Sequence, residues 1–283
     1  MSAPDKKLSQ KLEQVELQPD NSEILISVII VNYNVKEFVQ QVLHSLQKSL
    51  TTIPSEIFVI DNASDDGSQK MVTDQFPQVQ LIANKQNVGF SRANNQAIHI
   101  AKGKYVVLLN PDTITQEDTF STLLQFMDSH EDAGMATCKV LNPDGSLQLA
   151  CRRSYPTPWV AFTRLIGLSH FFPKSKLFGR YNLTFLPEDE MSEVEAISGS
   201  FMMVRRKALL DIGLLDEEFF LYGEDLDWCY RTIENGWKIY YVPTTQIIHF
   251  KGESSKQSRL DGMLIFYRAM ALFVKKHFRR RYL

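Results

Sequence analysis

The sequence predicts an α/β fold built on an open, mostly parallel sheet with helices on both faces. Four short apolar runs, at residues 27–31, 56–60, 79–82 and 105–109, show no alternation of apolar and polar positions. Runs of this kind are typical of strands that are buried on both faces. Helix-like sequence, such as the amphipathic stretch 35–49, separates each run from the next, which is the arrangement of parallel crossover units.

The composition is that of a globular protein. The chain has 283 residues, of which 44% are hydrophobic and 23% are charged, and these values exclude a disordered chain or a small disulfide scaffold. A net charge of -2 argues against nucleic acid as a partner. The three cysteines, Cys138, Cys151 and Cys229, form no CxxC pair, so they predict neither a disulfide framework nor a zinc site and fit a reducing, cytoplasmic location. No apolar run approaches the ~18 residues of a membrane-spanning helix.

The composition changes at Ile24 and again after residue 112. Residues 1–23 are charged and rich in glutamine and lack the apolar stretch of a secretory signal, so we expect a polar N-terminal extension, with a partner-binding arm as the alternative. Residues 24–283 form the expected domain. Its first part, 24–112, carries the alternating runs, and ligands of open sheets lie beyond the carboxyl ends of such strands. The second part is 113–283.

The second part has a looser pattern. The Asn-Pro-Asp-Gly sequence at 142–145 predicts a hairpin turn. Residues 152–192 have no clean period and predict a partly helical, loop-rich insert. The remaining pattern predicts ordered structure at 194–204, helices from Arg206 and Glu224, strands at 238–242 and 246–250, and a final helix at 256–278.

Polar residues follow the second and the fourth apolar runs. Asp61 ends an otherwise apolar strand, where a carboxylate can bind a ribose or a base edge, whereas the residues after it predict a turn. Asn110 and Asp112 are two positions apart and can face one ligand. A carboxylate with a carboxamide suits Mg²⁺ or Mn²⁺ carrying a diphosphate. A turn with Pro111 at its second position is the alternative for this segment.

Three carboxylates cluster at the start of the helix that begins at Glu224. Glu224, Asp225 and Asp227 follow the aromatic stretch 219–222, so a general base beside an apolar pocket is one interpretation. Favourable interaction with the helix dipole is the other. His249 lies at the end of a predicted strand, where a lone histidine is usually a packing residue.

Seven motifs occur together and in a fixed order along the chain. They occupy residues 27–34, 61–68, 87–95, 109–112, 198–200, 223–227 and 249–254. The set closely resembles the family 2 inverting glycosyltransferases of the GT-A fold, and within them the bacterial rhamnosyltransferase-like branch that builds cell-surface polysaccharides. The resemblance covers roughly residues 26–275.

The resemblance implies a role for each matching residue. The nucleotide-sugar pocket falls on Val31, Tyr33, Asp61, Asn87, Gly89 and Asn110. The Asp-x-Asp motif of the family reads Asn110-Pro111-Asp112 here, so its first acid is replaced. Metal ligands for Mg²⁺ or Mn²⁺ fall on Asp112 and His249, and the catalytic base falls on Asp225. We expect Ser198, Gly199 and Ser200 to let the backbone approach the sugar or the acceptor closely, with a plain strand-end turn as the alternative, and we expect Glu224 to contact the same ligands.

The implied reaction is a single displacement that moves a sugar from dTDP-rhamnose or a UDP-sugar to a hydroxyl of a glycan or lipid-linked acceptor. Two other classes of protein remain as alternatives to a glycosyltransferase. A sugar nucleotidyltransferase would carry a glycine-rich phosphate loop after the first strand, and residues 31–35 contain none. A non-catalytic nucleotide- or glycan-binding relative is favoured only by Asn110.

The final helix has an apolar stripe at helical spacing and a basic end. The stripe consists of Leu264, Tyr267, Ala271, Val274 and Phe278, and the basic residues are Lys275, Lys276, Arg279, Arg280 and Arg281. We expect the stripe to pack on the core with a solvated basic tip. The alternative is an interfacial helix that binds anionic lipid and places the protein on the inner face of the cell membrane.

Overall fold

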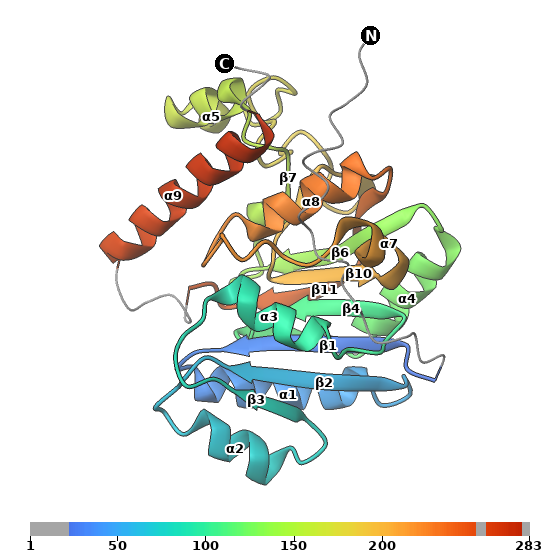
Figure 1. The fold of residues 1–283 in the computed structure, drawn as a ribbon. Helices are drawn as coiled ribbons and strands as arrows, with labels where there is room; N and C mark the ends of the chain where they lie inside the picture. The colour runs from blue at the N-terminus through green and yellow to red at the C-terminus, as the bar shows by residue number, and fades with distance from the viewer. Residues whose placement is uncertain (1–22, 253–258, 279–283) are drawn as a thin grey trace.

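The computed structural model describes residues 23–252 and 259–278 (Figure 1). The expected N-terminal extension at 1–23, apart from Glu23, and the basic residues Arg279, Arg280 and Arg281 lie outside the described residues. Within the two described ranges, no helix has the length and apolar character needed to cross a membrane.

The first half of the sheet is parallel, as predicted. Its strands are β1 (Ile26–Asn32), β2 (Ser55–Asp61), β3 (Gln80–Ala83) and β4 (Tyr105–Leu109), in the spatial order β3-β2-β1-β4. Every residue of β1 and β4 is buried, which explains why their sequences lack polar alternation. Because β1, β2 and β4 run in one direction, the polar residues that follow them lie at the same edge.

The second half of the sheet mixes strand directions. Strand β10 (Phe201–Arg205) lies antiparallel between β4 and β6 (Ala133–Leu141). Strand β11 (Lys238–His249) is parallel to β6 and pairs antiparallel with β5 (Thr113–Thr115) and β8 (Ser192–Glu193). Strand β5 was not predicted. Its pairing places Thr113 opposite His249 and so brings two distant motifs together.

The two strands predicted at 238–242 and 246–250 are one strand, β11, which ends at His249. The prediction of a break was wrong because the chain continues in extended form through the irregularity. Its pairing with β6 shifts register between Val242 and Gln246, around Pro243. Proline has no N–H for the ladder and is tolerated at such a bulge.

Helices cover both faces of the sheet (Figure 1). Right-handed crossovers place α1 (Lys36–Ser49) and α2 (Ser68–Gln75) on one face and α3 (Phe90–Ile98) on the other, because the chain reverses direction across the sheet after β3. Helix α1 buries Val39, Val42, Leu43 and Leu46, the spacing of a single helical face. Helix α4 (Thr119–Ser129) follows β5, and helices α7 (Arg206–Ile212) and α8 (Glu224–Glu234) begin at the predicted residues.

The loop-rich insert is partly helical, as expected. The turn at 142–145 forms with Gly145 at a φ of 82°, but its hairpin is reduced to one bridge between Leu141 and Leu147. A short 3-10 turn (Leu149–Cys151) follows, and then β7 (Arg152–Arg153), which pairs with β9 (Ala196–Ile197). Helices α5 (Pro158–Leu165) and α6 (Leu168–Phe171) complete the insert.

The final helix, α9 (Arg259–His277), does not pack through the predicted stripe. Leu264, Tyr267 and Val274 are 55%, 62% and 38% exposed, whereas Ala269 and Phe273 are buried. The core therefore contacts the opposite face of the helix. At 3.6 residues per turn the two sets lie on opposite sides, and both sides are apolar, so periodicity alone could not choose between them. Phe278, just past the helix, is the one tip residue of the stripe that is buried.

Candidate active site

The turn after β1 and β2 is built around Asp61. Its buried carboxylate accepts hydrogen bonds from Asn32 Nδ2 at 2.6 Å, Gln69 Nε2 at 2.7 Å and the Ser64 backbone N–H at 2.9 Å. A carboxylate offers about four acceptor positions, so the protein itself occupies most of them. Val31 lies at the end of β1, and Tyr33 is part of the turn that these bonds hold.

The loop that contains Asn87 and Gly89 connects this turn to the segment before α8. Asn87 Oδ1 accepts the Gly89 N–H at 3.0 Å, and Asn62 Nδ2 donates to the Gly89 carbonyl at 3.3 Å. Gly89 has a φ of +87°, and a Cβ there would lie 2.7 Å from the Phe220 ring. The Phe90 N–H donates to the Phe220 carbonyl at 2.7 Å. Glycine is therefore required by both conformation and space.

Asp112 and His249 meet at the carboxyl edge of the sheet. Both are buried, and His249 Nε2 lies 3.2 Å from Asp112 Oδ1. The Phe250 N–H donates to the Asp112 carbonyl at 2.8 Å, and Asn110 Nδ2 lies 3.3 Å from the same His249 nitrogen. The structure thus joins the motif after β4 to the histidine that ends β11.

Gln148 sets the tautomer of His249. Its Nε2 donates to the Asn142 Oδ1 and to the His249 carbonyl, each at 3.0 Å, so its Oε1 faces His249 Nδ1 at 2.7 Å. A carbonyl oxygen can only accept, so Nδ1 carries a proton, and Nε2 is the ring nitrogen that faces Asp112. The sequence contained no signal for Gln148, which lies beyond the predicted hairpin turn.

The Asp112–His249 pair has the chemistry of a metal site that is completed by the substrate. Asp112 Oδ1 is buried and, among the described residues, has no hydrogen-bond partner. It lies 3.2 Å from His249 Nε2, so a carboxylate oxygen and an imidazole nitrogen point to the same place, and both are ligand atoms for divalent cations. No group of three or more His, Cys, Asp or Glu side chains in the described ranges could hold a metal. Mg²⁺ is commonly held by one or two protein ligands together with phosphate and water, so the residues present fit Mg²⁺ or Mn²⁺.

The turn at Ser198, Gly199 and Ser200 lies between this pair and Asp225. The Asn110 N–H donates to the Ser200 carbonyl at 3.1 Å, and the Gly199 N–H lies 3.4 Å from Asp225 Oδ2. The Ser200 hydroxyl is buried without a hydrogen-bond partner among the residues that the structure describes. The predicted acceptor-side and metal-side residues are therefore neighbours.

Arg153 is a site residue that the sequence did not reveal. Its Nη2 donates to Asp225 Oδ2 and, at 3.2 Å, to the Ile197 carbonyl. The Arg153 and Asp225 side chains are only 11% and 14% exposed, so this is a largely buried ion pair. Arg153 reaches Asp225 because β7 pairs with β9, a contact between two-residue strands inside a segment without periodicity.

The three carboxylates of α8 occupy different environments. Glu224 is 6% exposed, and its Oε2 has no hydrogen-bond partner within the described part of the chain. Burial, together with the negative charge of neighbouring Asp225, raises the pKa of Glu224 well above its usual range. Asp227 is also buried, but it binds Arg231 Nε at 2.8 Å and Lys276 Nζ and His277 Nε2 at 2.7 Å each. Asp227 thus ties α9 to α8, whereas Asp225 faces Arg153 and the Gly199 N–H.

Comparison with known proteins identifies the family of this chain. A family model described as "Glycosyltransferase like family 2" matches residues 23–261. The chain is 26% identical over 261 residues to an N-acetylglucosaminyl-diphospho-decaprenol L-rhamnosyltransferase of Mycobacterium tuberculosis, covering 88% of this chain and 84% of that protein. It is also 26% identical over 265 residues to rhamnosyltransferase WbbL of Escherichia coli K12, covering 90% and 92%.

The fold is shared with solved glycosyltransferases. The structure of GalNAc-T7 with UDP, GalNAc and Mn²⁺ superposes with a TM-score of 0.59 at 16% identity, over 90% of this chain and 48% of that one. The fold is therefore of the GT-A type, as the motifs implied. The family match spans most of the chain, including every site residue described above. The chain belongs to glycosyltransferase family 2 and is a glycosyltransferase.

Proposed function

We propose that this enzyme transfers a sugar, with inversion, from dTDP-rhamnose or a UDP-sugar to a hydroxyl of a glycan or lipid-linked acceptor in cell-surface polysaccharide synthesis. The names of both bacterial relatives support rhamnose as the sugar, and the name of the Mycobacterium tuberculosis relative supports a polyprenyl-diphosphate glycan as the acceptor. The observation that carries the mechanism is the position of the Ser198–Ser200 turn, which bonds to Asn110 on one side and faces Asp225 on the other.

Residues 24–112 are assigned to the donor and residues 113–283 mainly to the acceptor. The residues proposed to line the nucleotide-sugar pocket surround the carboxyl ends of β1, β2 and β4, where ligands of open sheets bind. They are Val31, Tyr33, Asp61, Asn87, Gly89 and Asn110.

Asp112 and His249 are the proposed ligands of Mg²⁺ or Mn²⁺. Gln148 holds the His249 ring so that Nε2 faces Asp112. Such an ion, when bound, stabilises the negative charge of the departing diphosphate as a Lewis acid. Asn110 in place of an acid lowers the charge of the site, and its carboxamide still lies beside His249.

Asp225 is the proposed general base. Its carboxylate accepts the proton of the acceptor hydroxyl while that oxygen bonds to the anomeric carbon, opposite the breaking bond to the diphosphate. Arg153 and the Gly199 N–H hold Asp225 Oδ2. Burial and the charge of Asp225 raise the pKa of Glu224 to about 8, which favours its protonated form near neutral pH. Because diphosphate is already a good leaving group, no carboxylic acid has to protonate it.

The residues around Asp225 are proposed to contact the sugar or the acceptor. Ser198, Gly199 and Ser200 form the wall beside Asp225, and a Cβ on Gly199 would lie 3.9 Å from the Asp225 side chain. That distance is ordinary van der Waals contact, so a side chain would fit here, and glycine leaves this space to a ligand. Glu224 completes this wall from the first residue of α8.

Contact with an anionic bilayer through α9 is a further part of the proposal. The outward stripe of Leu264, Tyr267 and Val274 is exposed, and Lys275 lies next to it. Apolar side chains beside basic ones are the composition of an interfacial helix. Co-sedimentation with vesicles of anionic phospholipid, but not with neutral vesicles, is the expected result. Equal recovery with both vesicle types would contradict lipid contact by charge.

A thermal-shift screen tests the donor site. The protein is heated with dTDP, UDP, GDP or their sugars, with and without Mg²⁺ or Mn²⁺. We expect one nucleotide to stabilise the protein only when the metal is present, and Asp112→Ala to abolish that effect. Stabilisation that does not depend on the metal would remove Asp112 and His249 from the proposed role. No stabilisation by any nucleotide would contradict the donor site.

The base is tested by turnover of the nucleotide sugar that the screen identifies. Asp225→Asn is expected to lower kcat by about 10²–10⁴-fold, the usual contribution of general-base catalysis, while the melting shift caused by donor and metal is retained. Glu234→Gln, an exposed position on the same helix, is the control and should leave kcat unchanged. Normal turnover by Asp225→Asn would exclude Asp225 as the base.

A further inference from the structure

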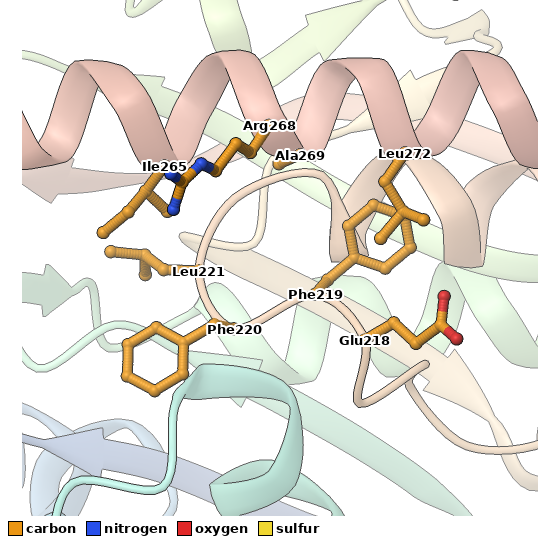
Figure 2. Close-up of a pocket in the computed structure, with 8 residues that line it drawn as sticks. All are labelled: Glu218, Phe219, Phe220, Leu221, Ile265, Arg268, Ala269 and Leu272. Atoms are coloured by element: carbon orange, nitrogen blue, oxygen red, sulfur yellow. The ribbon is translucent and has the colours of Figure 1, made fainter.

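A groove runs between the loop at 218–221 and helix α9 (Figure 2). Its volume of about 310 Å³ lies at the lower end of the range of small-molecule sites. The apolar side chains come from both walls and are Phe219, Phe220, Leu221, Ile265, Ala269 and Leu272. The lining contains no hydroxyl or carboxamide side chain, the groups that usually bind a sugar ring, so its chemistry suits a hydrocarbon chain.

The two charged residues of the groove lie at opposite ends. Figure 2 shows the Arg268 guanidinium beside Ile265, whereas the Glu218 carboxylate lies toward the Leu272 end. A guanidinium binds phosphate oxygens in a bidentate manner, and a carboxylate repels an anion. A ligand with one anionic end and one apolar chain would therefore bind in one orientation, with its anion at Arg268.

The groove adjoins the active site through Phe220. The Phe220 ring packs against Gly89 of the predicted donor pocket, and its carbonyl accepts the Phe90 N–H at 2.7 Å. The chain then continues through only four residues from Leu221 to Asp225. A ligand in the groove is thus held beside the proposed base, on the side assigned to the acceptor.

We propose that this groove binds the first isoprene units of a polyprenyl-diphosphate acceptor, with Arg268 on the diphosphate. The inference rests on the lipid-linked acceptor of the proposed function and adds a separate binding site for its lipid. The groove supplies apolar contact for the chain, Arg268 supplies the opposite charge, and Phe220 connects this position to the donor pocket. The sugar next to the diphosphate would then extend toward Asp225.

Farnesyl diphosphate is the probe for this site. Its binding to the full-length protein is measured by calorimetry with saturating UDP or dTDP and metal present, so that the donor site is filled. Inorganic diphosphate and farnesol serve as the two half-ligands. We expect farnesyl diphosphate to bind at least about tenfold more tightly than either of them, because only it uses both the apolar wall and Arg268.

Two groove variants and one matched control separate the contributions. Ile265→Asn should weaken binding of farnesyl diphosphate by about tenfold, and Arg268→Ala should reduce it to the level of farnesol without changing farnesol binding. Met263→Asn alters a nearby residue, which is 51% exposed and does not line the groove. It should bind the probe like the original protein. Unchanged melting temperatures of Arg268→Ala and Met263→Asn check folding.

Several results would overturn the inference. Equal affinity for farnesyl diphosphate and farnesol would show that Arg268 binds no diphosphate. Equal losses in Ile265→Asn and Met263→Asn would show that the hydrocarbon chain binds the outer surface of α9. Binding that disappears as protein concentration rises would show that a second copy covers the groove. If UDP or dTDP still binds with metal while farnesyl diphosphate does not, only this inference fails; loss of nucleotide binding contradicts the proposed function itself.

Discussion

Arg153 and Asp225 form an ion pair across 72 residues of sequence, and both side chains are largely buried. The guanidinium also binds the Ile197 carbonyl, so its position is fixed by the backbone and not only by the carboxylate. This double attachment makes Arg153 a positioning residue for the proposed base. A fixed carboxylate loses less orientational freedom when the acceptor hydroxyl approaches.

The first prediction concerns Arg153. Arg153→Ala leaves the buried Asp225 without its cation, a change that typically costs about 3–5 kcal/mol of unfolding free energy. We also expect kcat to fall while KM for the donor changes little, because Arg153 does not face the predicted nucleotide residues. Arg153→Lys keeps the positive charge but cannot reproduce the guanidinium that contacts both Asp225 and the Ile197 carbonyl, so its kcat should lie between those of the original protein and Arg153→Ala. Steady-state kinetics at fixed metal concentration measure this order, and equal losses of kcat in both variants would contradict it.

The second prediction concerns Gln148, which contacts the His249 ring and would not contact a metal. Gln148→Leu removes the acceptor for the Nδ1 proton, so the ring loses its fixed tautomer and orientation. Partners of this kind typically contribute about 10–100-fold to metal affinity. Titration of Mn²⁺ in the presence of the donor nucleotide, followed by electron paramagnetic resonance, should show a loss in this range. Gln116→Leu, at a position outside the site, is the control.

The third prediction is a pH dependence caused by Glu224. The unfolded chain releases this proton above about pH 4.3, but the folded protein retains it because the pKa of Glu224 is raised by burial and by Asp225. Between about pH 4.3 and the folded pKa of about 8, the folded state therefore binds more protons than the unfolded chain. The unfolding free energy falls as the pH rises through this range.

Glu224→Gln should remove this decline. The variant should match the original protein near pH 4 and be more stable at pH 8, as measured by urea unfolding at both pH values. Glu131→Gln, an exposed position, should show no such difference. Parallel pH curves for Glu224→Gln and the original protein would show that Glu224 is ionised in the folded state.

The fourth prediction concerns the attachment of α9 through Asp227. Burial alone would raise the pKa of Asp227, but the hydrogen bond from His277 and the charges of Arg231 and Lys276 outweigh it and hold that pKa well below its usual range. The stabilisation is present above the unfolded pKa of about 3.9 and is lost as the pH falls toward the lower folded value. Asp227→Asn should cost about 3–5 kcal/mol at pH 7 and much less at pH 2.

Asp216 provides the matched control for this prediction. It binds the same lysine, with Asp216 Oδ2 at 2.5 Å from Lys276 Nζ, but its side chain is 24% exposed. A partly exposed pair of this kind contributes about 1 kcal/mol or less. Urea unfolding should therefore show a much smaller loss for Asp216→Asn than for Asp227→Asn. Equal losses would mean that Lys276, and not the buried carboxylate, determines the attachment.

The fifth prediction compares two glycines with positive φ. An alanine at Gly145 has nothing within 4 Å of its Cβ, whereas an alanine at Gly89 would meet the Phe220 ring at 2.7 Å and its carbonyl at 2.8 Å. Gly145→Ala measures backbone strain alone, which is about 1–2 kcal/mol. Gly89→Ala should cost clearly more and should weaken nucleotide binding, because Phe220 has to move. Similar melting temperatures for the two variants would show that the Phe220 contact yields at little cost.

Local sequence predicted the parallel half of the fold and the strand ends at which several of the candidate site residues lie. Apolar runs at 27–31, 56–60 and 105–109 became β1, β2 and β4 because a strand covered on both faces needs apolar residues at every position. The residues that end these strands meet at one edge for a geometric reason, since parallel strands share their carboxyl end. Asp61 and Asp112 were therefore identifiable from local sequence alone.

The way the distant parts combine depends on the folded chain as a whole. Arg153 reaches Asp225 through two-residue strands, and Gln148 reaches His249 across 101 residues, contacts that no local periodicity encodes. Periodicity also left the orientation of α9 open, because both of its sides are apolar. The buried side is the one that contacts Asp227 and Tyr230 of α8. The apolar periodicity of a helix shows which of its faces can be buried. Which of those faces is buried depends on the charge pairs and the packing that form in the folded chain.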